Sequence, residues 1–61
     1  MNSAHILIVD DEKRICSSLT GILEDEGYKV RAVQDGHTAL EELEVHLPDL
    51  VVLDLWMPGI D

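Results

Sequence analysis

The sequence has few large side chains, little cysteine and little positive charge. Its 61 residues include no phenylalanine, one tryptophan, one tyrosine and a single cysteine, Cys16. A single cysteine excludes an internal disulfide, and the apolar runs are far shorter than the ~20 residues that cross a bilayer. No charged segment leads into a long apolar run at the start, so nothing indicates export. These absences predict a cytoplasmic protein without membrane contact, whose core is built from Ile, Leu and Val.

The charge balance is strongly acidic. Thirteen Asp and Glu residues stand against 4 Lys and Arg residues, which gives a formal net charge of −9. Such a surface repels phosphate-rich partners, so we expect this segment to bind neither nucleic acid nor an anionic membrane. The same charge suits a bound cation.

Two apolar runs end directly in acidic residues. Residues 5–9 (HILIV) precede Asp10 and Asp11, and residues 50–53 (LVVL) precede Asp54. Both runs are typical of strands whose two faces are covered. If the strands are parallel neighbours, the three carboxylates meet at one edge of a sheet, which is where ligands bind in open α/β folds.

The intervening residues predict two helices and a further strand. A helical period covers residues 12–26 and Gly27 ends it, whereas residues 28–33 alternate as an edge strand does. A second helix is expected over about residues 37–46, before Pro48. The inward stripe predicted for the first helix is Ile15, Leu19, Ile22 and Leu23, with Cys16 at its margin, and that for the second is Leu40, Leu43 and Leu47.

The resulting order β-α-β-α-β predicts an α/β fold with a parallel sheet. Right-handed crossovers allow the strand order 2-1-3, as in flavodoxin-like folds, or 3-2-1. Lys29 and Arg31 make the second strand a poor central strand. The order 2-1-3 is therefore favoured.

Converging carboxylates repel one another unless a cation lies among them. Mg²⁺ fits such a site, because it takes oxygen ligands and is usually held by one or two carboxylates together with phosphate oxygens. An aspartate beside the metal can act as a nucleophile towards phosphorus and form an aspartyl-phosphate. The alternative is structural: Asp10 and Asp11 would cap the first helix, and Asp54 would open a turn with Pro58 and Gly59.

These motifs together resemble the receiver domain of bacterial two-component response regulators. Residues 6–12 (ILIVDDE) are similar to the family's first strand and acidic pair, and residues 52–59 (VLDLWMPG) are similar to its phosphoacceptor strand and loop. The amino-acid sequence of this loop most resembles that of the receivers of NtrC-type, σ54-dependent regulators.

The resemblance implies a role for each site residue. Asp54 would accept a phosphoryl group from a sensor histidine kinase. Asp11, Asp54 and the backbone carbonyl of Trp56 would bind Mg²⁺ directly, and Asp10 would reach the metal through water. The resemblance also implies a signalling module that is not an enzyme and that regulates transcription as part of a longer protein.

The family pattern has five strands and five helices, whereas residues 1–61 cover three strands. We therefore expect an N-terminal fragment of a receiver domain, a flavodoxin-like half-fold that ends after the third strand and the phosphoacceptor loop and does not switch by itself. The third strand then has an unpaired apolar edge, which is a template for another chain. This predicts self-association, as a two-fold homodimer or an oligomer that exchanges elements.

Two rival functions remain open. Mg²⁺-dependent phosphatases with an aspartate nucleophile use a second Asp two residues later as general acid, but Trp56 occupies that place here. The other rival is a structural module in which self-association is the whole function. Phosphorylation of Asp54 by a small phosphodonor separates the receiver from the structural module, and hydrolysis of an added phosphomonoester would favour the phosphatase.

Overall fold

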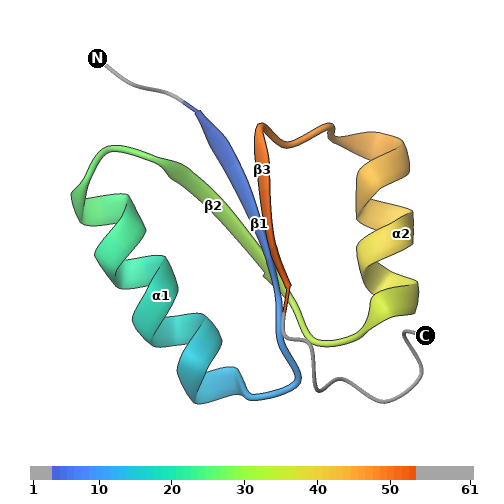
Figure 1. The fold of residues 1–61 in the computed structure, drawn as a ribbon, viewed down its shortest axis with the longest axis horizontal. Helices are drawn as coiled ribbons and strands as arrows, with labels where there is room; N and C mark the ends of the chain where they lie inside the picture. Colours follow the sequence, from blue (N-terminus) through green and yellow to red (C-terminus); the bar gives the residue numbers. More distant parts are fainter. Residues whose placement is uncertain (1–3, 54–61) are drawn as a thin grey trace.

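The structure, a computed structural model, describes residues 4–53 and shows a three-stranded parallel sheet between two helices. Figure 1 shows one helix on each face of the sheet. The strand order β2-β1-β3 confirms the expected α/β fold and the order 2-1-3. In chain order the elements are β1 (His5–Val9), α1 (Lys13–Asp25), β2 (Lys29–Val33), α2 (Gly36–Val45) and β3 (Leu50–Leu53).

The central strand β1 is the best-buried part of the described chain. It pairs with β2 from His5 to Val9 and with β3 from Ile6 to Val9. Because both edges are paired and helices lie against both faces, residues 6–9 are all buried, and Ile8 is 0% exposed. A continuous apolar run without alternation is the sequence that such a position requires.

The alternation of side chains along β1 divides the apolar core in two. Successive side chains point to opposite faces of the strand, so the two sets pack against different helices. Ile6 and Ile8 form the α1-side core with Cys16, and Leu7 and Val9 form the α2-side core. The half-buried residues around the α1-side core are Leu19, Leu23, Tyr28 and Val30, and the α2-side core also contains Val33 and Ala39, with Leu43 packed against it.

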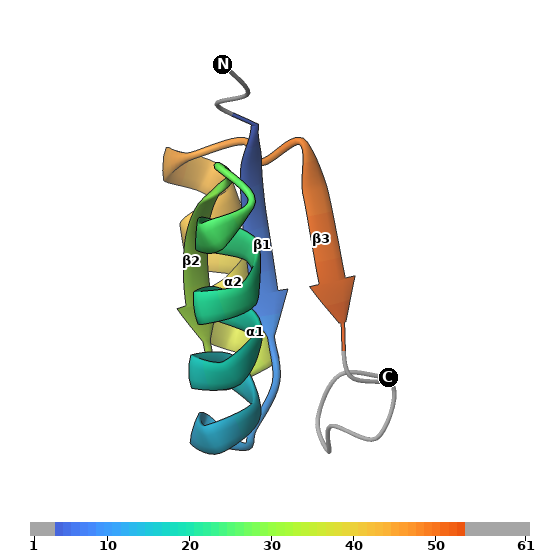
Figure 2. The ribbon, with the colours of Figure 1, turned by 90° about the vertical axis from the view of Figure 1, so that its left-hand side faces the viewer.

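The inward face of α1 differs from the predicted stripe. Ile15 and Ile22 are 43% and 60% exposed, whereas Cys16, expected at the margin, is 4% exposed. The helix packs mainly against β2 and β1, and Figure 2 shows β3 to one side of it. On the side that faces the sheet, Cys16 is buried and Leu19 and Leu23 are half-buried, whereas the flanking isoleucines are exposed.

The inward face of α2 was also predicted too broadly. Ala39 is buried and Leu43 packs against the core, but Leu40 and Leu47 are 65% and 86% exposed. Leu47 lies beyond the end of the helix at Val45, so it no longer follows the helical period. Leu40 lies outside the core cluster and lines an open groove between α2 and β3 instead.

The helix boundaries differ from the prediction by one residue. Helix α1 runs from 13 to 25 rather than from 12 to 26, α2 from 36 to 45, and β2 begins at Lys29. Gly27 ends α1 as predicted, with φ of 96°, a left-handed conformation that glycine adopts without a Cβ clash. The N–H groups of Gly27 and Tyr28 donate to the carbonyls of Glu24 (3.0 Å) and Leu23 (3.1 Å), which is the Schellman pattern.

Polar bonds cap α2 and link it and β3 to the other strands. Asp35 is the N-cap of α2, and its Oδ1 accepts the Thr38 N–H at 2.7 Å. The Nε of Arg31 lies 2.7 Å from a carboxylate oxygen of Glu42, which joins β2 to α2. At the start of β3, Asp49 donates its backbone N–H to the carbonyl of His5 and accepts the His5 N–H, both at 2.7 Å.

The cap at Asp35 predicts a pH dependence of stability. The Thr38 N–H bond is the largest cause that holds the pKa of Asp35 below its ordinary value of 3.8. Because the folded pKa is the lower one, this carboxylate stabilises the fold above pH 3.8, and the contribution is lost as the pH falls through the lowered pKa. We expect Asp35→Ala to lower the melting temperature at pH 7 and to have little effect at strongly acidic pH.

The matched control for Asp35→Ala is Asp35→Asn, since asparagine caps helices without a titrating charge. Thermal unfolding followed by circular dichroism should show Asp35→Asn close to the unmodified chain at pH 7. An Asp35→Ala effect that is the same at every pH would contradict the role of the ionised cap.

Burial predicts a contrast between two isoleucines. Ile8→Val removes a methylene from a fully buried site and should lower the free energy of unfolding by about 1 kcal/mol. Ile22→Val, at a site that is 60% exposed, should change it by less than about 0.5 kcal/mol. Urea unfolding followed by circular dichroism measures both. Equal effects would mean that Ile22 is buried after all, as the sequence pattern suggested.

Candidate functional site

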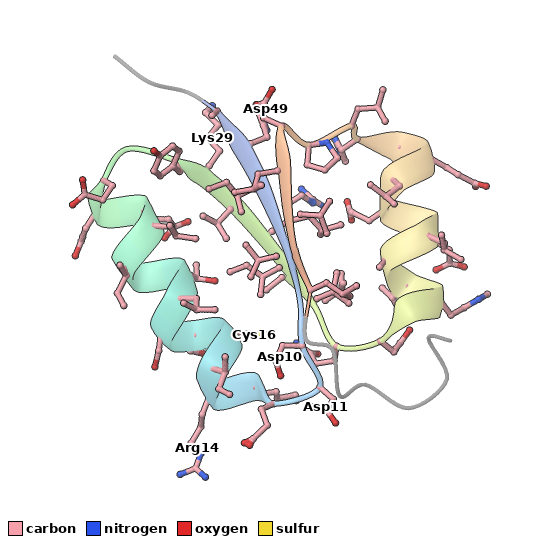
Figure 3. The ribbon with its side chains drawn as sticks, viewed as in Figure 1. Asp10, Asp11, Arg14, Cys16, Lys29 and Asp49 are labelled. Atoms are coloured by element: carbon pink, nitrogen blue, oxygen red, sulfur yellow. The ribbon has the colours of Figure 1, made fainter. Side chains whose placement is uncertain are left out.

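Asp10 and Asp11 lie together where β1 ends. Figure 3 shows both at the end of the sheet opposite to Lys29 and Asp49. This end is the carboxyl edge of all three parallel strands, because β1 pairs in parallel with β2 and with β3. The structure therefore confirms that the acidic pair lies at the edge where ligands bind in open α/β folds.

Asp10 is held in place by three bonds. The residue is only 8% exposed. Its N–H donates to the carbonyl of Val33 at 3.1 Å, and its Oδ1 accepts the backbone N–H of Glu12 at 2.9 Å. Its carbonyl accepts the thiol of Cys16 at 3.5 Å. The N–H, the carbonyl and one carboxylate oxygen of a single residue are thus all occupied.

The two neighbouring carboxylates have different environments. Asp11 is exposed, whereas Asp10 is buried. Within residues 4–53, no hydrogen-bond donor occupies the carboxylate of Asp11, and only Oδ1 of Asp10 accepts a bond. Asp11 therefore has both oxygens available for a cation, and Asp10 has one.

The structural alternative for the acidic pair is only partly met. The N-cap of α1 is Glu12, whose side chain makes no capping bond, and the Asp10 carboxylate bonds to Glu12 rather than to an N–H inside the helix. This local bond closes an Asx-type turn between β1 and α1. Asp11 takes no part in it.

Sequence reasoning gave Cys16 and Gln34 no place at this edge. Cys16 Sγ also lies 4.0 Å from the carbonyl of Val33 and accepts the side-chain amide of Gln34 at 3.8 Å. The available signal was weak: Cys16 is a small residue one helical turn into α1, and Gln34 follows β2. Neither position carries a motif that predicts contact with Asp10.

The remaining predicted site residues, Asp54 and Trp56, lie outside the described residues. The register nevertheless reaches the neighbour of Asp54, because Val9 pairs with Leu53. Among residues 4–53, no group of three His, Cys, Asp or Glu side chains is arranged to hold a metal ion. The described part of the chain also contains no helix long and apolar enough to cross a membrane.

Comparison with known proteins identifies the family. Residues 6–61 match the family model described as the response regulator receiver domain. The nitrogen assimilation regulatory protein NtrX of Azorhizobium caulinodans is 50% identical over 54 residues, a match that covers 88% of this chain and 12% of that protein. The chain belongs to the response regulator receiver domain family.

Two further relatives are regulators of different names. The alkaline phosphatase synthesis transcriptional regulatory protein PhoP of Bacillus subtilis is 46% identical over 92% of this chain and 23% of its own length. The regulatory protein VanRc of Enterococcus gallinarum is 42% identical over 97% of the chain and 26% of its own length. The chain thus spans about an eighth to a quarter of these relatives. The similarity to NtrX agrees with the likeness to NtrC-type regulators read from the loop.

Membership of this family indicates what domains of this kind generally do. Receiver domains belong to two-component response regulators and are in general signalling modules rather than enzymes. They typically use Mg²⁺ and generally interact with a histidine kinase. The acidic pair at the carboxyl edge of the sheet is chemically suited to that ion, because hard cations prefer carboxylate oxygens.

Proposed function

We propose that this chain accepts a phosphoryl group on Asp54, next to a Mg²⁺ ion held by Asp11, Asp54 and the backbone carbonyl of Trp56. Asp10 would bind the ion through water. The observation that carries the proposal is the parallel register of Val9 with Leu53, since an acidic residue follows each of these two in the sequence.

The environments of the two described acids support their different roles. The carboxylate of Asp10 is buried and bound to the Glu12 N–H, so its position is fixed and one oxygen is already used. A carboxylate fixed in this way suits a position outside the direct ligands of the metal, where it orients a water molecule bound to the ion. Asp11 is exposed and has both oxygens free of described donors, as a direct ligand requires.

The proposed reaction is a phosphoryl transfer. A carboxylate oxygen of Asp54 would form a bond to phosphorus as the bond from phosphorus to the donor's imidazole nitrogen breaks. Bound Mg²⁺ would supply neutralisation of the charge on the phosphoryl oxygens. The residues of this chain would position the carboxylate and the ion, which is most of what such a transfer needs.

The wider context is proposed from the family. The phosphodonor would be a sensor histidine kinase, and the longer protein would regulate transcription in the cytoplasm, as is typical of response regulators. That residues 1–61 are the N-terminal part of a receiver domain remains a prediction. So does the expectation that they do not switch by themselves.

The acceptor role predicts covalent labelling. Incubation with Mg²⁺ and a small acyl phosphate should add the mass of one phosphoryl group, which intact-mass spectrometry would detect. Asp54→Asn should abolish the addition, and Asp11→Asn should reduce it at least about tenfold through weaker metal binding. Asp25→Asn, at an exposed acid near the end of α1, is the matched control and should behave as the unmodified chain does.

Two outcomes would count against the acceptor role. Labelling that persists in Asp54→Asn would place the acceptor elsewhere. Steady release of phosphate from an added phosphomonoester would instead favour the phosphatase, although Trp56 takes the place of that class's general acid.

Self-association is a second proposal, and it rests on β3. All four of its residues are exposed, from 36% for Val52 to 55% for Leu50. Figure 2 shows β3 to one side of both helices. The other edge strand, β2, carries Lys29 and Arg31, charges that discourage pairing with another sheet, whereas β3 is entirely apolar.

The groove beside β3 extends the apolar surface. It has a volume of about 400 Å³ and is lined mainly by Leu7, Val9, Leu40, Leu43, Val51 and Leu53. A second copy that pairs β3 with β3 around a two-fold axis would cover the open edge in both copies. Under the structural alternative, this pairing would be the whole function.

A lysine on β3 should therefore prevent association. Val52→Lys would place a charge in the proposed pairing edge, and light scattering at tens of micromolar should then show a monomer. Ala32→Lys is the matched control, because Ala32 and Val52 both pair with Ile8 on the same rung but at opposite edges. We expect Ala32→Lys to remain dimeric. A folded monomer in the unmodified chain would overturn the proposal.

A further inference from the structure

Three segments of the chain meet at Cys16. Its side chain is buried in the first turns of α1, where Figure 3 shows it close to Asp10. The thiol donates to the carbonyl of Asp10 at 3.5 Å, and the sulfur accepts the side-chain amide of Gln34 at 3.8 Å. One buried side chain thus joins α1 to the loop after β1 and to the loop after β2.

We propose that Cys16 and Gln34 position Asp10 for Mg²⁺ binding. This inference rests on the proposed function, since it assigns both residues to the same metal site. Cys16 acts through the main chain of Asp10, and Gln34 acts through Cys16. Both are therefore positioning residues and neither touches the ion.

The argument begins with where the β1 ladder stops. The last paired residue of β1 is Val9, so Asp10 is the first residue whose path the sheet alone does not fix. Its N–H is still held by Val33. Among the described residues, Cys16 is the donor to its carbonyl, so loss of the thiol would remove the bond that orients the peptide after Asp10.

That peptide leads directly to the two groups that matter for the site. Asp11 follows it, and the N–H of Glu12, one residue further on, holds the Asp10 carboxylate at 2.9 Å. A rotation after Asp10 would therefore move the Asp11 carboxylate and weaken the bond that fixes the Asp10 carboxylate. Groups that orient metal ligands in this way typically contribute about 10- to 100-fold to metal affinity.

The competing explanation is that Cys16 only fills the α1-side core. Leu19 offers the matched control, because it packs in the same core, on the same helix, and makes no hydrogen bond to Asp10. Cys16→Ala and Leu19→Ala both remove core volume, but only the first removes the donor to Asp10. Gln34→Leu keeps a similar volume and removes only the amide, and Cys16→Ser restores a donor.

The first measurement uses no metal. Amide hydrogen exchange, followed by NMR in chains shown to be folded by circular dichroism, should be faster at Glu12 in Cys16→Ala by about tenfold relative to Leu19→Ala. Gln34→Leu should give a smaller increase, and Cys16→Ser should lie nearer to the unmodified chain. Equal exchange at Glu12 in Cys16→Ala and Leu19→Ala would overturn the inference.

The second measurement is a titration with MgCl₂, followed by the amide shifts of Asp11 and Glu12. We expect the dissociation constant to rise about three- to tenfold in Cys16→Ala and to stay within about twofold in Leu19→Ala, since a thiol is a weak donor. If the unmodified chain binds Mg²⁺ and Cys16→Ala binds it equally well, only the positioning inference fails. If the unmodified chain shows no response, the proposed metal site fails and the inference fails with it.

Discussion

The structure depends on burying one strand on both faces and pairing it along both edges. Strand β1 is apolar from Ile6 to Val9, so neither face can be left in water. The chain meets this requirement with α1 on one face, α2 on the other, and β2 and β3 alongside. Both edge strands pair with β1, and both helices pack side chains against it, so the chain leaves β1 at a well-held point. The residue at this point is Asp10, and Asp11 follows it.

The element types and their order could be predicted because each depends on local sequence. The apolar runs and the stop at Gly27 predicted the elements, and the charges on β2 favoured the observed order 2-1-3 over 3-2-1. The buried helix faces were harder, because a 3.6-residue period fits more than one row of positions. Helix α1 packs mainly against β2 and β1, so a single row of its residues faces the core and Ile15 and Ile22 remain exposed. How much of the sheet lies beneath a helix depends on the tertiary fold, and the hydrophobic period of a single helix does not reveal it.

The carboxylates of the site could be predicted from the sequence, but the residues that hold them in position could not. Asp10 and Asp11 could be identified from the sequence because a charge directly after an apolar strand is unusual. The bonds that fix Asp10 join residues that are 2, 6 and 23 positions away, through loops whose path the sequence pattern does not determine. Cys16 in particular reads as a small apolar residue, and its contacts with Asp10 and Gln34 depend on how closely α1 approaches the sheet.

The placement of the acids links ligand binding to folding. Asp10 takes its fixed position only when β1 is paired and α1 is packed, since the Val33 carbonyl and the Cys16 thiol that hold it belong to other elements. An ion that binds this arrangement and not the unfolded chain stabilises the fold by mass action. In a chain of net charge −9, a cation at the acidic edge would also relieve repulsion between carboxylates. Strand β1 therefore supports both the core and the proposed site. A change that destabilises the packing of β1 would also weaken ion binding at that site.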